Sequence, residues 1–111
     1  MITIRKQEEM EEYYVEEMNT YLFNNDVEFL FEVDVKANIK VVGSIINNYN
    51  IKAHYINALH INAWNINAFD IAACNICANN INADDIKAFN IKANNITSSN
   101  IKSINIPSIN M

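Results

Sequence analysis

Cys74 and Cys77 are the residues whose types and spacing best suit chemistry, because Cys-x-x-Cys pairs occur in zinc and redox sites. A zinc site needs four ligands in a tetrahedral arrangement, and the chain has no second Cys-x-x-Cys pair. His54 would stack beside Cys74 if the chain formed a coil of four pentapeptides, with His60 on the next corner. We expect two incidental surface cysteines, with no metal and no cofactor.

Other catalytic arrangements are not indicated. Cys74, His54 and Asp70 make a triad only if the directions of their side chains are ignored. The single Gly43 and the single Pro107 exclude glycine-rich phosphate loops and dinucleotide fingerprints. We also expect no concave site with paired carboxylates, because a coil with a filled axis has no cavity. The sequence therefore predicts a protein that is not an enzyme.

Length and composition indicate one small domain. The chain has 111 residues, a net charge of −5 and 50% apolar residues, which argues against a basic nucleic-acid-binding face and against disorder. No apolar run approaches the ~20 residues of a membrane span, and the first residues lack the apolar core of a signal peptide. Two cysteines without a secretion signal indicate reduced thiols, so we expect a cytoplasmic protein.

Isoleucine recurs at every fifth position of the second half of the chain. A helix does not fit, because five residues turn a helix by about 500° and successive isoleucines would face every direction. A flat strand does not fit, because its side chains alternate with a period of two. The positions are Ile51, Ile56, Ile61, Ile66, Ile71, Ile76, Ile81, Ile86, Ile91, Ile96, Ile101 and Ile106, and Met111 takes the next place.

A coil with one short extended face per five residues does fit. Isoleucine and the residue two places later point the same way, as alternate strand residues do. That residue is alanine from Ala53 to Ala93, then Ser98, Ser103 and Ser108. Asparagine or aspartate precedes ten of the twelve isoleucines, and such short polar side chains suit corners. We expect isoleucine and alanine inside the coil and asparagine at its corners.

This five-residue repeat resembles that of the pentapeptide-repeat family. Its NINA and DIKA motifs also look like those of short repeat proteins of phages and mobile elements. The resemblance covers residues 34–111 and implies a mainly β fold, a right-handed β-helix with four sides, one pentapeptide to a side. In the family a small residue precedes the large central one by two places, whereas here alanine follows isoleucine, as in Ile66-Asn67-Ala68.

The number of pentapeptides per coil decides which side chains stack. With four pentapeptides, Asn65, Asp85 and Asn105 form a ladder. The exposed columns are then Phe69, Phe89 and Ile109, and beside them Trp64 and Ile104. With three pentapeptides, the ladder is instead Leu59, Cys74, Phe89 and Ile104. The repeat unit favours four sides, although the sequence leaves both periods open. Because exposed aromatic side chains mark interfaces, Trp64, Phe69 and Phe89 are candidate partner-binding residues.

The N-terminal residues predict a helix and a strand that cover the first coil. Within residues 5–23, apolar side chains recur at helical spacing, and residues 27–35 alternate like a strand. A solenoid has an unpaired edge at each end, which must be covered to prevent aggregation. We expect an α-helix and strand cap in residues 1–35 and a β-helix in residues 36–111, together forming one structural domain.

Charge is divided between these two parts. Residues 1–36 contain ten acidic and three basic side chains, a net of −7, and residues 37–111 contain three acidic and five basic ones, a net of +2. Pentapeptide-repeat proteins that mimic DNA need an acidic coil, so here the acidic helix would have to supply the charge. The candidate residues for a basic groove on a partner are Glu8, Glu9, Glu12 and Glu16, with Glu11 and Glu17 beside them.

The repeat ends without a capping helix, which favours an end-to-end dimer. The expected dimer interface is Ile104, Ile106, Ile109 and Met111. By analogy with the family, we expect a non-enzymatic inhibitor that binds a host protein, a topoisomerase or a CRISPR nuclease, at its nucleic-acid-binding surface. This would be a phage anti-defence protein that contacts neither nucleic acid nor membrane directly. The alternative is a self-assembling spacer or virion component.

Overall fold

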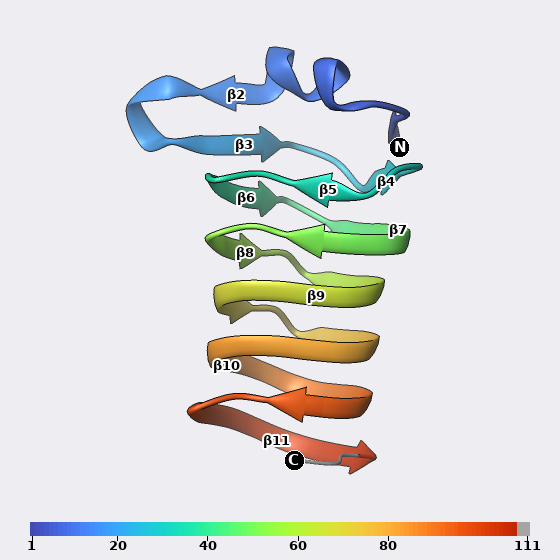
Figure 1. Ribbon diagram of the computed structural model, residues 1–111, viewed down its shortest axis with the longest axis vertical. Helices are drawn as coiled ribbons and strands as arrows, with labels where there is room; N and C mark the ends of the chain where they lie inside the picture. Colours follow the sequence, from blue (N-terminus) through green and yellow to red (C-terminus); the bar gives the residue numbers. More distant parts are fainter. Residues whose placement is uncertain (109–111) are drawn as a thin grey trace.

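The chain forms a mainly β solenoid of about five turns, whose coils stack along one axis from the N-terminal end to the C-terminal end (Figure 1). The computed structural model describes the backbone of residues 1–108 and the side chains of residues 1–101. The coil expected from the isoleucine repeat is confirmed, and its right hand stays a prediction.

Two short 3-10 helices lie near the N-terminus, and the remaining elements are strands. The elements are β1 (Ile2–Ile4), η1 (Gln7–Tyr13), β2 (Tyr14–Val15), η2 (Glu16–Met18), β3 (Thr20–Phe23), β4 (Val27–Phe29), β5 (Val33–Asp34), β6 (Asn38–Val41), β7 (Ser44–Lys52), β8 (Tyr55–Asn57), β9 (His60–Ala72), β10 (Asn75–Thr97) and β11 (Asn100–Ser108). The long strands β9 and β10 pass round corners, so one strand contributes to more than one face of the coil.

Isoleucine fills the axis, as the repeat predicts. Each repeat isoleucine from Ile51 to Ile96 is at most 2% exposed, and most of the alanines two places later are buried too. Burying one isoleucine contributes about 1.5–3 kcal/mol, so stability is distributed evenly along the coil. Ala73 and Ala78 are partly buried and pack against this core.

The repeating coils have three sides of one pentapeptide each, so the expected coil of four pentapeptides is wrong. Strands β9 and β10 pair in parallel with Ile61 beside Ile76 and Asn65 beside Asn80. The next step pairs Ile86 of β10 with Ile101 of β11. Three sides enclose less than half the area that four sides of the same length enclose. One isoleucine and one alanine per side therefore fill the interior at normal packing density.

Asparagine side chains form ladders along the corners. Nδ2 of Asn80 donates to Oδ1 of Asn65 over 2.7 Å, and Nδ2 of Asn95 donates to Oδ1 of Asn80 over 2.8 Å. A second ladder of the same kind joins His60, Asn75 and Asn90. Asparagine ladders were expected, but the partner of Asn65 is Asn80 and not Asp85.

The first coils are longer than the later ones. Thr20 pairs with Asn38, eighteen residues on, and Asn38 pairs with Tyr55, seventeen residues on. An extra residue also enters the corner of β7, where the pairing shifts between Asn47 and Asn50. Asn47 is 1% exposed, and its Nδ2 donates to the carbonyls of Phe31 and Asn50. The irregular corner is thus stabilised by a buried amide.

Gly43 is required by a close approach between coils. A Cβ at this position would collide with Oδ1 of Asp26, which accepts a hydrogen bond from the backbone N–H of Ser44 over 2.8 Å. The absent side chain leaves room for the carboxylate to join two coils at this corner.

The long helix expected over residues 5–23 is wrong. Only η1 and η2 are helical there, and Asn19, with φ of 49°, ends η2 in the left-handed region. Residues of β3 pair in parallel with β6 and bury Thr20, Tyr21 and Phe23. Aromatic and β-branched residues favour strands, and this pairing outweighs the helical spacing of the sequence.

The strand expected over residues 27–35 is divided into β4 and β5, with a corner between them. Both strands pair in parallel with β7, so the ladders continue across the expected boundary at residue 35. Met10 of η1 is fully buried, and the ring of Tyr13 lies 4.7 Å from that of Phe23. Helix η1 therefore packs on the first coil, and its role as a cap stays a prediction.

Candidate functional site

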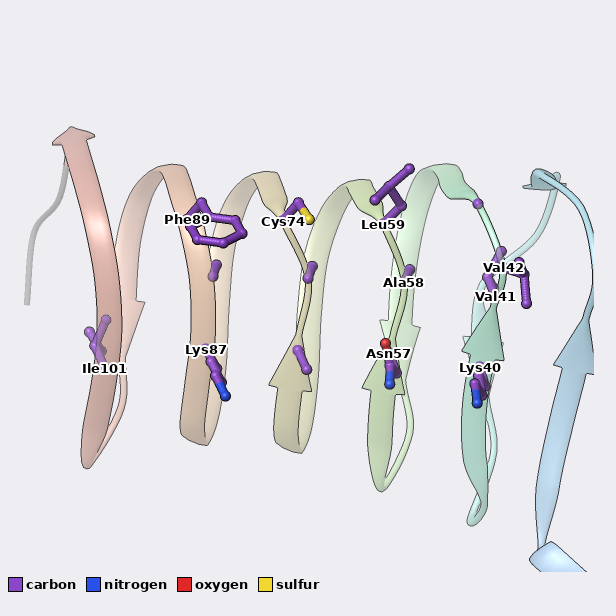
Figure 2. Close-up of a pocket in the computed structure, with 14 residues that line it drawn as sticks. Lys40, Val41, Val42, Asn57, Ala58, Leu59, Cys74, Lys87, Phe89 and Ile101 are labelled. Carbon is purple, nitrogen blue, oxygen red and sulfur yellow. The ribbon is translucent and has the colours of Figure 1, made fainter.

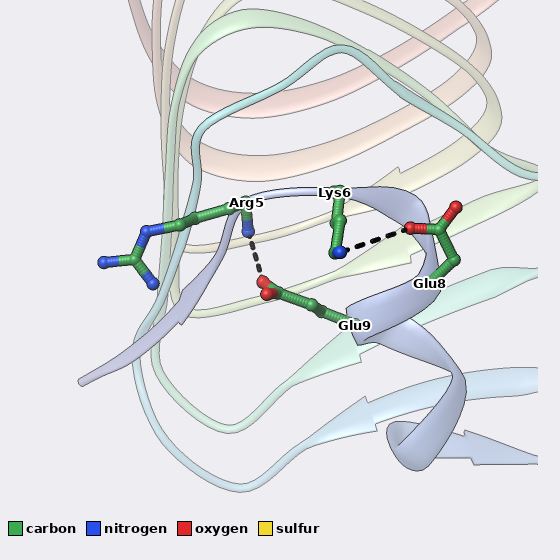
Figure 3. A network of polar contacts seen from close by, with 4 residues as sticks. All are labelled: Arg5, Lys6, Glu8 and Glu9. Carbon is green, nitrogen blue, oxygen red and sulfur yellow. Dashed lines mark hydrogen bonds and ion pairs between the residues drawn. The ribbon is translucent and has the colours of Figure 1, made fainter.

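The acidic residues of η1 and η2 lie together at the N-terminal end of the rod. Five side chains are exposed: Glu8, Glu11, Glu12, Glu16 and Glu17, while Glu9 is half-buried. Nζ of Lys6 lies 4.0 Å from Oε2 of Glu8, and the backbone N–H of Arg5 donates to Oε1 of Glu9 over 2.7 Å (Figure 3). An exposed ion pair of this length neutralises little of the local field, so this surface is acidic.

Two tyrosines beside these glutamates have a raised pKa. Burial raises the pKa of Tyr13 most, and the charge and hydrogen bond of Glu12, with the charge of Glu9, raise it further. Burial also raises the pKa of Tyr21, with a further contribution from Glu11. Burial is the main cause of both shifts, and the nearby carboxylates add to them because a negative charge disfavours a phenolate.

The three candidate aromatic residues are exposed but do not form the expected columns. Trp64, Phe69 and Phe89 are 59%, 58% and 56% exposed. With three pentapeptides per coil, Phe69 and Phe89 lie on different corners, so the predicted column of Phe69, Phe89 and Ile109 is wrong. The ring of Phe69 instead lies 5.3 Å from that of His54, at an interplanar angle of 74°.

Phe89 belongs to the ladder that the three-sided alternative predicts. The backbone N–H of Phe89 donates to the carbonyl of Cys74, whose own N–H donates to the carbonyl of Leu59. Trp64 precedes Asn65 on a third corner. The exposed aromatic side chains thus lie on three corners and do not form one surface.

Cys74 and Cys77 are free thiols, the first half-buried and the second exposed. The ring of His54 contacts that of Phe69 edge to face and does not lie beside Cys74, so that expectation is wrong. Within residues 1–108, no three histidine, cysteine, aspartate or glutamate side chains gather as metal ligands would.

Two surface features were missed by the sequence analysis. Asp70 and Asp85 stack in a shallow depression between Tyr55 and Asn100, so carboxylates do pair on a concave surface. A larger groove of about 950 Å³ runs beside the ladder of Leu59, Cys74 and Phe89. Both follow from the three-sided coil, which places these residues at equivalent positions of successive turns.

The expected dimer interface lies at the C-terminal end. Ile104 and Ile106 belong to β11, with side chains outside the described ones, and Ile109 and Met111 lie outside the described residues altogether. Along residues 1–108, neither short helix has the length and hydrophobicity of a membrane span.

Comparison with protein families, with curated proteins and with solved structures found no match to the chain.

Proposed function

We propose that the protein is a non-enzymatic inhibitor that binds another protein at its nucleic-acid-binding surface. The observation that carries this proposal is the separation of charge along the rod. Residues 1–36 have a net charge of −7 and residues 37–111 have +2, and the exposed glutamates of η1 and η2 gather at one end. A surface that binds phosphates is basic and would attract such an end.

The class of target rests on analogy. The repeat resembles the pentapeptide-repeat family, whose DNA-mimicking members bind a topoisomerase in place of DNA. Its NINA and DIKA motifs also resemble those of phage and mobile-element proteins. We therefore propose a topoisomerase or a CRISPR nuclease as the target, in the cytoplasm of a bacterial host. Trp64, Phe69 and Phe89 would each contribute contacts on a separate corner, because exposed aromatic side chains are frequent hot spots.

The experiment is a DNA supercoiling assay with a bacterial topoisomerase and a cleavage assay with an RNA-guided nuclease, each with the protein added. Inhibition in either assay is expected, and Glu12→Lys with Glu16→Lys should abolish it without lowering the melting temperature. Asp34→Lys with Asp84→Lys is the matched control, since it changes the charge equally at exposed positions away from η1 and η2. Absence of inhibition in both assays, or equal loss in both variants, would overturn the proposal.

A self-assembling spacer or virion component is the second candidate, favoured by the edge of β11. In the described part of the chain, β11 pairs with β10 on one side and with no strand on its other side. An open edge of this kind pairs readily with another chain. A two-fold dimer would close it and give twice the mass of 12.7 kDa, whereas head-to-tail stacking gives polymers. Light scattering across a concentration series separates a dimer, which supports the inhibitor reading, from filaments, which support the spacer.

A further inference from the structure

A groove runs along the rod on the face that passes from β6 through β8 and β9 to β10 (Figure 2). Its floor is made of small side chains, Ala58, Ala73 and Ala88, which occupy the alanine position of three successive coils. Because the alanines leave the floor low, the longer side chains on either side form two walls. The groove is open to solvent along its outer side.

One wall of the groove is apolar. Val42, Leu59 and Phe89 are 62%, 50% and 56% exposed, and the half-buried Cys74 lies in the same row. A continuous row of exposed apolar side chains in a soluble protein usually marks an interaction site. This row extends over four coils.

The opposite wall carries positive charge. Lys40 and Lys87 are exposed at its two ends, with Asn57 and Ala72 between them. No carboxylate lines the groove, and among the described residues neither lysine forms an ion pair. The groove is therefore a basic and apolar surface on a protein whose net charge is −5.

We propose that this groove binds an extended peptide with acidic side chains at positions i and i+4 and apolar side chains at i+1 and i+3. Lys40 and Lys87 are three coil steps apart, since Lys40 pairs with Asn57, Asn57 with Ala72 and Ala72 with Lys87. At about 4.8 Å per step this is about 14 Å. Four residues of an extended chain span about 13 Å, so two carboxylates on one side would match both lysines.

The alternation of an extended chain then places its apolar side chains against Leu59 and Cys74, which lie one and two coil steps from the level of Lys40. A single acyl chain fits less well, because the open side of the groove would leave its methylene groups in water. An extended peptide instead turns the N–H and C=O groups of every second residue toward the open side, where water can bond to them. This inference is independent of the proposed inhibitor function, since it uses a basic face of the coil and not the acidic end.

The experiment measures fluorescence polarisation of a labelled peptide, Gly-Asp-Leu-Ser-Leu-Asp-Gly, titrated with the whole protein. Saturable binding is expected, weakening as salt is raised from about 50 to about 500 mM because the Debye length shortens. Lys40→Glu with Lys87→Glu should weaken binding by about tenfold or more. The matched control is Lys52→Glu with Lys92→Glu, two exposed lysines outside the groove, and should change binding by less than about threefold.

Leu59→Ser tests the apolar wall and should also weaken binding, and an unchanged melting temperature shows that each variant is folded. A peptide with lysine in place of both aspartates should not bind. The proposal is overturned if the aspartate peptide shows no saturable binding, if the lysine peptide binds equally, or if both charge variants lose binding alike. Saturable binding of decanoate without peptide binding would assign the groove to an acyl chain instead.

Discussion

Asp70 and Asp85 occupy the same position in successive coils, in register across β9 and β10, so their side chains are neighbours in one column. Burial raises the pKa of Asp70 above the usual 3.8, and the hydrogen bond to Asp85 and the charges of Asp85 and Asp84 raise it further. Nδ2 of Asn100 donates to Oδ1 of Asp85 over 2.9 Å, so this column continues as an amide. The column therefore runs Tyr55, Asp70, Asp85 and Asn100, with two carboxylates side by side.

The carboxyl pair makes stability depend on pH. Because the folded pKa of Asp70 is raised, the folded state binds more protons between the unfolded and folded values. Stability is therefore fully present below the unfolded pKa and falls as the pH rises through the window up to the folded pKa. Asp70→Asn should flatten this dependence and raise the melting temperature at pH 7 by a few degrees, since removing directly opposed like charges is worth about 0.2–1 kcal/mol. Thermal melts at several pH values check this, with Asp34→Asn as the control, and a steeper dependence in Asp70→Asn would contradict it.

Because isoleucine fills the axis, a substitution at a repeat isoleucine should lower stability far more than the same substitution at the outward-facing residue next to it. Ile76 is 2% exposed and Cys77 is exposed, so the pair gives matched positions on one strand. Ile76→Lys buries an unpaired charge and should unfold at least the central coil, and Ile76→Ala should cost about 2–5 kcal/mol. Cys77→Lys should melt within a few degrees of the unchanged protein. Circular dichroism melts measure the difference, and equal melting of the two lysine variants would disprove a filled axis.

The asparagine ladder contributes measurable stability. Asn80 donates to Asn65 and accepts from Asn95, so Asn80→Ala removes two hydrogen bonds. At about 0.5–1.5 kcal/mol for each bond, we expect a loss of about 1–3 kcal/mol. Asn67→Ala, at an exposed position on a face of the coil, is the control and should change stability by less than about 0.5 kcal/mol. Urea denaturation followed by circular dichroism gives both values, and a similar loss in the two variants would rule out a special role for the ladder.

The coil should tolerate removal of five residues better than removal of four. Deletion of residues 82–86 joins Ile81 to Lys87 and keeps every later isoleucine and alanine facing inward. Deletion of residues 82–85 joins Ile81 to Ile86. The isoleucines and alanines after the deletion are then one residue out of register, so they no longer occupy the inward positions. We expect the shorter deletion to destroy cooperative melting, while the five-residue deletion keeps a β spectrum and a cooperative transition. The reverse order of stability would be incompatible with one face per pentapeptide.

The repeat predicted the inside and outside of the coil correctly because each face obeys a local rule. Ile61 and Ala63 share one side of a short strand wherever the chain turns next. The number of faces depends on how tightly isoleucine and alanine fill a cross-section, which is a property of three dimensions. The three-sided ladder of Leu59, Cys74 and Phe89 was visible in the sequence, but the five-residue unit alone did not favour it over the four-sided alternative.

The N-terminal helix was mispredicted for a different reason. Met10, Tyr13 and Tyr21 recur at helical spacing, yet Tyr21 is buried by a strand that pairs with a segment eighteen residues later. Such pairing is invisible in a local pattern, and it outweighs propensity where it buries aromatic side chains. The carboxyl pair and the groove were missed because they depend on the coil period.

Because successive coils are held together by parallel strand pairs, their hydrogen bonds point along the length of the rod. Tension applied between the two ends would therefore load the bonds of one turn at a time and peel the turns off in sequence. In the repeating coils each event would release three pentapeptides, about 50 Å of extended chain, so this part of the molecule would yield in equal steps under a weak pull. A force perpendicular to the axis of the rod would act along the covalent backbone of many coils together and would meet far greater resistance.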